Sequence, residues 1–64
     1  MWIDVNTTLP DYEQLHPVST GRDTSWGKRV MTNARGEHWR VIHPGGHFED
    51  RTDVTHWYDL GIAP

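Results

Sequence analysis

Residues 28–48, KRVMTNARGEHWRVIHPGGHF, are the stretch that decides the fold. Two runs within it, 28–33 and 37–43, predict two strands joined by the polar turn NARGE. The Pro-Gly-Gly of residues 44–46 is a hairpin turn signal, and Phe48 begins a further short strand. This order predicts an antiparallel meander, in which each strand pairs with the next one along the chain.

The segments outside the meander predict the rest of the fold. Residues 2–5, WIDV, and residues 54–60, VTHWYDL, have the composition and alternation of strands. Pro and acidic residues near 10–15 predict one short helical turn. Residues 16–27 hold Pro, Gly, Ser and Thr and predict a long, mobile loop. We therefore expect a mainly β protein, or a small α+β one: a twisted antiparallel sheet or partly open barrel of four to five short strands.

The chain has 64 residues, which is enough for one small domain. This is close to the lower size limit for folding without disulfides or a bound metal. It has no cysteine, but it has four tryptophans, and large rings bury much apolar area per residue. We expect the core to consist of these rings and nearby aliphatic residues: Trp2, Ile3, Val5, Leu9, Val30, Trp39, Val41, Phe48, Val54, Trp57 and Leu60.

The two ends of the chain resemble those of a known family. WIDVNTTLP at 2–10 and VTHWYDL at 54–60 are similar to the opening W-I-x-V-x-x-x-L-P and closing V-T-H-W-x-x-L of a small phage and prophage family of unknown function, number 551 in the series of such families. The co-occurrence of the two motifs indicates that the first and last strands pair. The resemblance implies a phage or prophage source and no activity for any residue, and it leaves the segment 16–27 without a counterpart.

Charge limits the classes of partner. The net charge is −3, and the six Lys and Arg residues form no basic run, so a phosphate-binding surface is disfavoured. The alternative that remains is a small nucleic-acid-binding barrel, with Trp39 as a stacking platform beside four basic residues: Lys28, Arg29, Arg35 and Arg40. No apolar run approaches the ~20 residues of a membrane span, and no secretory signal is present. A cytoplasmic location follows by default, in the host cell if the protein is phage-encoded.

Five histidines suggest a second alternative, a histidine-rich metal-binding module. His43 and His47 flank the Pro-Gly-Gly turn, which would bring them opposite each other, and His56 could complete a site. The spacing matches no standard zinc motif, so we predict no metal site and no cofactor. Strand alternation places His56 on the face opposite Trp57, where it would be a hydrogen-bonding link between strands.

The remaining function class is protein binding. The sequence lacks a nucleophile elbow and a phosphate-cradling glycine pattern, so we do not expect an enzyme. Trp26, Tyr58 and Tyr12 are candidates for exposed binding anchors, with Arg22 and Asp23 at the rim. We expect a small accessory protein that binds and occludes a host or phage protein. An edge strand could also pair with a second copy of the chain.

Overall fold

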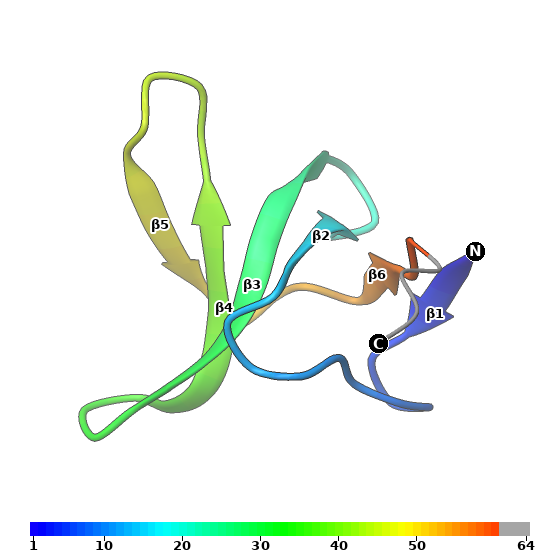
Figure 1. Ribbon diagram of the computed structural model, residues 1–64, viewed down its shortest axis with the longest axis horizontal. Helices are drawn as coiled ribbons and strands as arrows, with labels where there is room; N and C mark the ends of the chain where they lie inside the picture. The colour runs from blue at the N-terminus through cyan, green and yellow to red at the C-terminus, as the bar shows by residue number, and fades with distance from the viewer. Residues whose placement is uncertain (61–64) are drawn as a thin grey trace.

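A computed structural model describes residues 1–60 of the chain as six β-strands in one sheet (Figure 1). No helix occurs within these residues, and therefore none that is long and apolar enough to cross a membrane. The prediction of a mainly β fold with a twisted, partly open sheet is confirmed, with six strands in place of four to five. The strands are β1 (Trp2–Asp4), β2 (Leu15–Ser19), β3 (Thr24–Thr32), β4 (Gly36–Ile42), β5 (Phe48–Arg51) and β6 (His56–Tyr58).

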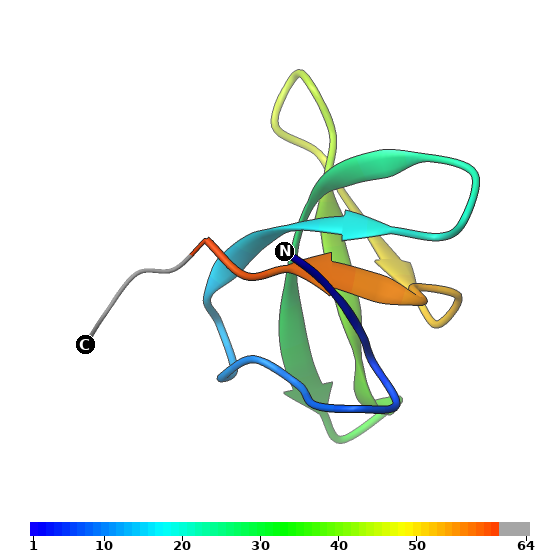
Figure 2. The same ribbon diagram turned by 90° about the vertical axis from the view of Figure 1, so that its right-hand side faces the viewer.

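The strand order across the sheet is β1-β6-β2-β3-β4-β5, and every neighbouring pair is antiparallel. The last strand therefore lies between the first two, as Figure 2 shows for β6 beside β1 and β2. Ile3 lies opposite Trp57, and Trp2 lies opposite Tyr58. The predicted pairing of the first and last strands is thus present.

The meander β3-β4-β5 follows the prediction closely. The turn between β3 and β4 ends at Gly36, whose φ of 70° is in the region that favours glycine. The Pro-Gly-Gly turn brings His43 and His47 together, because the His43 amide donates to the His47 carbonyl at 2.9 Å. Gly45 and Gly46 also have positive φ, which explains why two glycines follow the proline.

The expected long loop at 16–27 is wrong. Most of this segment is strand, since it contains β2 up to Ser19 and the first four residues of β3. Only the turn between Ser19 and Thr24 is irregular, and Gly21 there has a φ of 91°. The turn-forming residues of the segment therefore serve one tight connection instead of a loop.

The expected helical turn at 10–15 is also wrong. Glu13 has a φ of 67°, which a right-handed helix does not allow. Its amide donates to the carbonyl of Arg29 at 2.9 Å, so the segment forms a turn at Tyr12 and Glu13 that is held against β3. A run of six residues is too short to gain from helical hydrogen bonds, and the contact with β3 decides its conformation.

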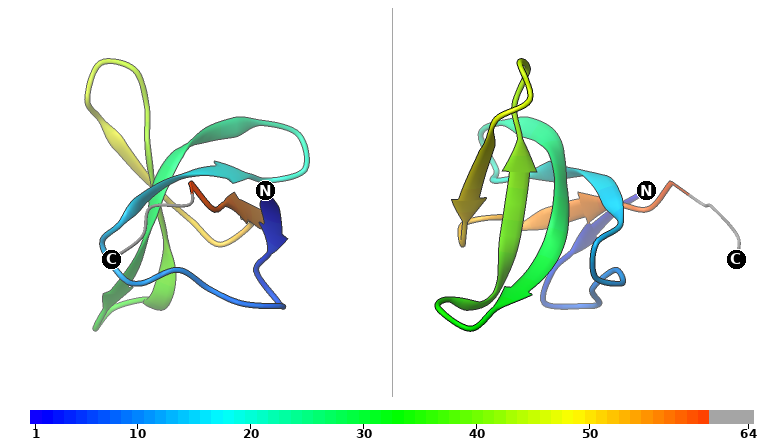
Figure 3. Two further views of the ribbon diagram at one scale, coloured as in Figure 1. Left: turned by 45° about the vertical axis from the view of Figure 1, so that its right-hand side comes forward. Right: turned by 60° about the vertical axis from the view of Figure 1, so that its left-hand side comes forward.

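The sheet curls around a single core on its inner face. In Figure 3, β3, β4 and β5 lie on one side, and β1, β2 and β6 lie on the other. The buried cluster between them is Val18, Trp39, Val41, Val54 and Trp57, with Ile3 and Val5 packed against it. With no helix in residues 1–60 to cover this face, the sheet buries it by folding over on itself.

Four residues that we expected in the core lie at the surface instead: Trp2, Leu9, Phe48 and Leu60. The sheet has only one inner face, and side chains alternate between the faces along each strand. Trp2 and Phe48 are on the outer face, where Trp2 contacts the ring of Tyr58 and not that of Trp57. Val30 is buried but is not part of the core cluster.

His16 occupies a place in the core that the sequence did not suggest. Its ring lies edge-on to Trp57, with the centroids 5.0 Å apart, and it is nearly inaccessible to water. Neither ring nitrogen has a hydrogen-bond partner in the structure. A buried polar atom without a partner loses its hydration and gains nothing in return.

The substitution His16→Leu should therefore stabilise the fold. Leucine fills a similar volume and has no polar atoms, so we expect the free energy of unfolding to rise by about 1 kcal/mol. Urea denaturation followed by tryptophan fluorescence measures this. His16→Gln is the control, since it keeps polar atoms in the same place and should not stabilise. A lower denaturation midpoint for His16→Leu would contradict the interpretation.

Gly27 allows β2 and β4 to approach β3 closely. A Cβ atom at this position would lie 3.0 Å from a methyl group of Val18 and 3.3 Å from the carbonyl oxygen of Arg40. We expect Gly27→Ala to lower the free energy of unfolding by about 1–3 kcal/mol, because the backbone must shift. Ser25→Ala, on the same face of the same strand, is the control and should have little effect. Equal denaturation midpoints for both variants would refute this role of Gly27.

Candidate functional site

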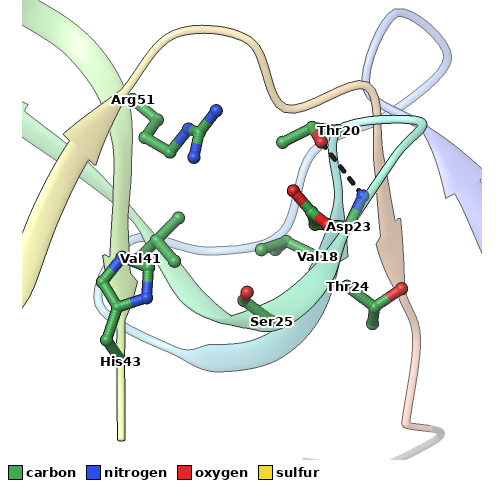
Figure 4. A pocket seen from close by; sticks show the side chains of 8 residues that line it. All are labelled: Val18, Thr20, Asp23, Thr24, Ser25, Val41, His43 and Arg51. Carbon is green, nitrogen blue, oxygen red and sulfur yellow. Dashed lines mark hydrogen bonds between the residues drawn. The ribbon is translucent and has the colours of Figure 1, made fainter.

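One pocket opens on the inner side of the sheet. It has a volume of about 260 Å³, and its lining includes the core residues Val18 and Val41. Figure 4 shows the polar residues around them: the side chain of Arg51 extends from β5 toward Thr20, whose hydroxyl accepts a hydrogen bond from the Asp23 amide. The full lining is Val18, Thr20, Asp23, Thr24, Ser25, Val41, His43 and Arg51.

The charge of Arg51 is already matched by its neighbours. Its guanidinium donates two hydrogen bonds to Asp53, at 2.6 and 2.8 Å, and one to Glu49 at 3.0 Å. These contacts raise the pKa of Arg51 and lower that of the Asp53 carboxyl. An anion entering the pocket would have to displace two carboxylates. The pocket is therefore a poor anion site.

The pocket also lacks the geometry of a catalytic site. Asp23, Ser25 and His43 are the residue types of a hydrolytic triad, but no hydrogen bond joins them in the structure of residues 1–60. The His43 ring instead lies 3.4 Å from a Glu49 oxygen and stacks on the ring of His47. A serine without a hydrogen-bonded base is not activated for attack.

The histidines do not form a metal centre within the described residues. His43 and His47 are stacked with centroids 5.2 Å apart, but residues 1–60 contain no group of three or more His, Cys, Asp or Glu side chains that could hold a metal ion. His56 lies on another part of the sheet, with one ring nitrogen 3.0 Å from the Thr55 hydroxyl and the other 3.9 Å from an Asp4 oxygen. His56 is on the face opposite Trp57, as predicted, but its 3.0 Å hydrogen bond is with the adjacent Thr55, and 3.9 Å to Asp4 is too long for the predicted hydrogen bond between strands.

The outer face of the sheet carries a continuous row of apolar side chains. Trp2 lies opposite Tyr58, and Trp26 lies opposite both Pro17 and Ile42. Val18 lies opposite Trp57, and extending this register by one residue places Pro17 opposite Tyr58. Ile42 lies opposite Phe48. Each strand thus contributes one residue. We call this set the outer row: Trp2, Tyr58, Pro17, Trp26, Ile42 and Phe48.

Three rings of the outer row are largely in water. Trp2, Trp26 and Phe48 are 44%, 53% and 59% exposed. At about 150–250 Å² for each whole aromatic side chain, these exposures leave roughly 250–400 Å² of ring surface accessible to solvent. Leu15, on the same face of β2, is also exposed and extends this area. The largest apolar patch on a typical monomer is about 300–600 Å² and is often functional, so this surface is a candidate interaction site.

The basic residues near the outer row are paired with acids. Lys28 lies 3.2 Å from Glu13, and Arg40 donates to Asp50 at 3.0 Å. Arg29, which lies opposite Trp39 on the other, inner face of the sheet, is also bound to a carboxylate, that of Glu37. A phosphate backbone would therefore meet charges that are already neutralised.

Trp39 cannot be the base-stacking platform that we considered from the sequence. It is buried in the core, because it is on the inner face of β4. Arg35 is an exposed residue of the turn between β3 and β4, and its amide donates to Thr32 at 3.2 Å. The predicted nucleic-acid surface is therefore not assembled around this ring.

The structure brings together only part of the predicted binding residues. Trp26 and Tyr58 belong to the outer row, although Trp26 is on β3 and not in a loop. Tyr12 lies elsewhere, with the guanidinium of Arg29 4.0 Å from its ring centroid. Arg22 and Asp23 are exposed in the turn between β2 and β3, beside the inner pocket. The sequence interpretation missed Trp2, Phe48 and Leu15 as surface residues.

Comparison with protein-family models, curated proteins and solved structures gives no match to this chain. The choice of a candidate site therefore depends on the geometry alone. The outer row is the candidate that this geometry favours over the inner pocket.

Two surface carboxylates should make the fold sensitive to acid. Arg40 holds the pKa of Asp50 below its ordinary value of 3.8, and Arg51 does the same for Asp53. The folded chain thus binds protons at these two carboxyl groups less tightly than the unfolded chain does. The stabilisation is complete at a pH above the ordinary pKa of the unfolded chain, and it is lost as the pH falls through the lowered pKa values of the folded chain. Urea midpoints measured from about pH 7 down to about pH 3 should fall at the acid end.

The double variant Asp50→Asn, Asp53→Asn is the control for this titration. Its midpoint should start lower at neutral pH and change less on acidification, since the two carboxyl groups are gone. An equally steep fall for the variant would show that other groups cause the acid sensitivity.

Proposed function

We propose that this protein is a small, non-enzymatic, phage-type accessory protein that binds a host or phage protein through the outer row and occludes the surface it covers. The observation that carries the proposal is the row itself, with one apolar side chain from each of the six strands. The resemblance of the chain ends to a phage family supports the source, and the cytoplasm of the host is the compartment that the proposal assumes.

Residue types in the outer row support this use. Tryptophan and tyrosine are enriched among interface residues that contribute most to binding, because they bury a large area at low entropic cost. Trp2 and Tyr58 hold each other in place by an edge-to-face contact with centroids 5.4 Å apart. Ordering this pair before binding reduces the entropy lost on association.

The sheet edges favour the face over strand addition as the contact surface. The two edge strands are β5 and β1. β5 has the sequence FEDR, with three charged residues in succession, and β1 is only three residues long. Charged or short edge strands resist pairing with another chain. A homodimer through an edge strand is thus a weaker proposal than contact through the outer row.

Affinity purification from the natural host tests the proposal. The tagged protein should recover a specific protein, and Trp26→Ser combined with Phe48→Ser should lose it, because about two thirds of the exposed ring surface of Trp2, Trp26 and Phe48 is removed. The control is Met31→Ser, since Met31 is as exposed as Phe48, at 59%, but is not part of the outer row. Recovery of the same protein by the double variant would contradict the proposal.

A further inference from the structure

From β6 to β5, the aromatic residues of the outer row are on every second strand, whereas Trp2 on β1 is outside this alternation because β1 is the direct neighbour of β6. Tyr58 on β6, Trp26 on β3 and Phe48 on β5 are separated by the smaller Pro17 on β2 and Ile42 on β4. Neighbouring strands are about 4.8 Å apart, so successive aromatic side chains are spaced by about 10 Å along the row. Between β6 and β5, the outer row therefore alternates three aromatic side chains with two smaller apolar ones at a regular interval.

A polyproline II helix has nearly the same repeat. It has three residues per turn and a rise of about 3.1 Å per residue, which places equivalent side chains about 9.3 Å apart. Aromatic residues recognise such segments by packing against proline rings, and the segment loses little entropy since it is already extended. We propose that the outer row binds a proline-rich segment of its partner that runs across the strands. This inference rests on the proposed function and specifies the partner's chemistry.

The area and shape of the face argue against a second copy as the occupant. A stable protein–protein contact buries about 800 Å² on each partner, about two to three times the ring surface that is accessible here. The sheet curls around its core, so the outer face is convex (Figure 3), and two convex faces make a small contact. An extended segment can follow a convex row, so the available surface suits it better.

Charge favours a proline-rich segment with a basic end. The chain has a net charge of −3, and the cations beside the row, Lys28 and Arg40, are paired with Glu13 and Asp50. Asp4 is on the same face of β1 as Trp2, two residues away, at one end of the row. An arginine next to the prolines would lie near this carboxylate, whereas a polyanion would be repelled.

Titration with a peptide of ten prolines followed by one arginine tests the inference. Saturable change in tryptophan fluorescence is expected, since Trp2 and Trp26 are exposed and would be covered. Trp26→Ala should weaken binding at least tenfold, Trp26→Phe should retain most of it, and Met31→Ala should leave it unchanged. Asp4→Asn should reduce the advantage of the arginine over a peptide without it. Circular dichroism of each variant confirms that it is folded.

Three results would overturn the inference. They are the absence of saturation at millimolar peptide, equal binding of a Gly-Ser peptide with the same arginine, and tighter, salt-dependent binding of oligothymidine. The proposed function is separable from this result. If the host protein is still captured in a Trp26-dependent manner while the proline peptide does not bind, only the polyproline chemistry is wrong. If neither binds, both are wrong.

Discussion

The indole of Trp57 holds together parts of the chain that are far apart in the sequence. Its strand lies between β1 and β2, and the ring packs in the core cluster with Val18 and Trp39. The indole nitrogen donates to the carbonyl of Thr8 at 2.9 Å, which fixes the segment after β1. Because no helix covers the inner face within residues 1–60, one large side chain must fill the space between the two halves of the curled sheet. The positions of β1, β2 and the segment between them depend on this ring.

This arrangement has a consequence for the faces of the sheet. A single curled sheet has one inner face, and that face holds only a few large rings: Trp39 and Trp57 occupy it, and His16 is packed against Trp57. The other aromatic residues must be on the outside, since side chains alternate along each strand. The outer row is therefore formed by the same alternation that builds the core. The outer row is exposed because the inner face of the sheet has too few side-chain positions for all the aromatic residues of the chain.

Much of the fold could be predicted from local signals. The turn at Gly36 and the Pro-Gly-Gly hairpin were predicted because turn residues act over short distances. The pairing of the first and last strands was predicted from the co-occurrence of the two end motifs in the family that the chain resembles. Strand β2 was not predicted from the sequence, because it contains Pro17 and proline is unusual in a central strand of a sheet. The structure suggests how β2 accommodates it: the paired residues of β2 and β6 end at Val18, next to the proline that lacks an amide hydrogen.

The candidate site could be predicted only in part, for a different reason. Trp26 and Tyr58 were expected at the surface, but Trp2 and Phe48 were assigned to the core because aromatic residues are usually buried. Alternation alone contains the missing signal, since Ile3 next to Trp2 is the inward residue. Which residues of different strands lie side by side depends on register, and register is a property of the folded sheet. The outer row is thus visible only once β6 is known to lie between β1 and β2.

The contrast between the edges and the face of the sheet makes this row informative. The chain closes its edges to other strands, with the charged residues of β5 on one side and the short β1 on the other. It does not protect the outer face in the same way, although polar residues at Trp26 or Phe48 would leave the core intact and reduce the risk of aggregation. Exposed rings that the core does not need are the observation on which we base the proposal of a binding surface. That argument favours the outer face over the inner pocket, whose lining is needed to complete the core and to pair its own charges.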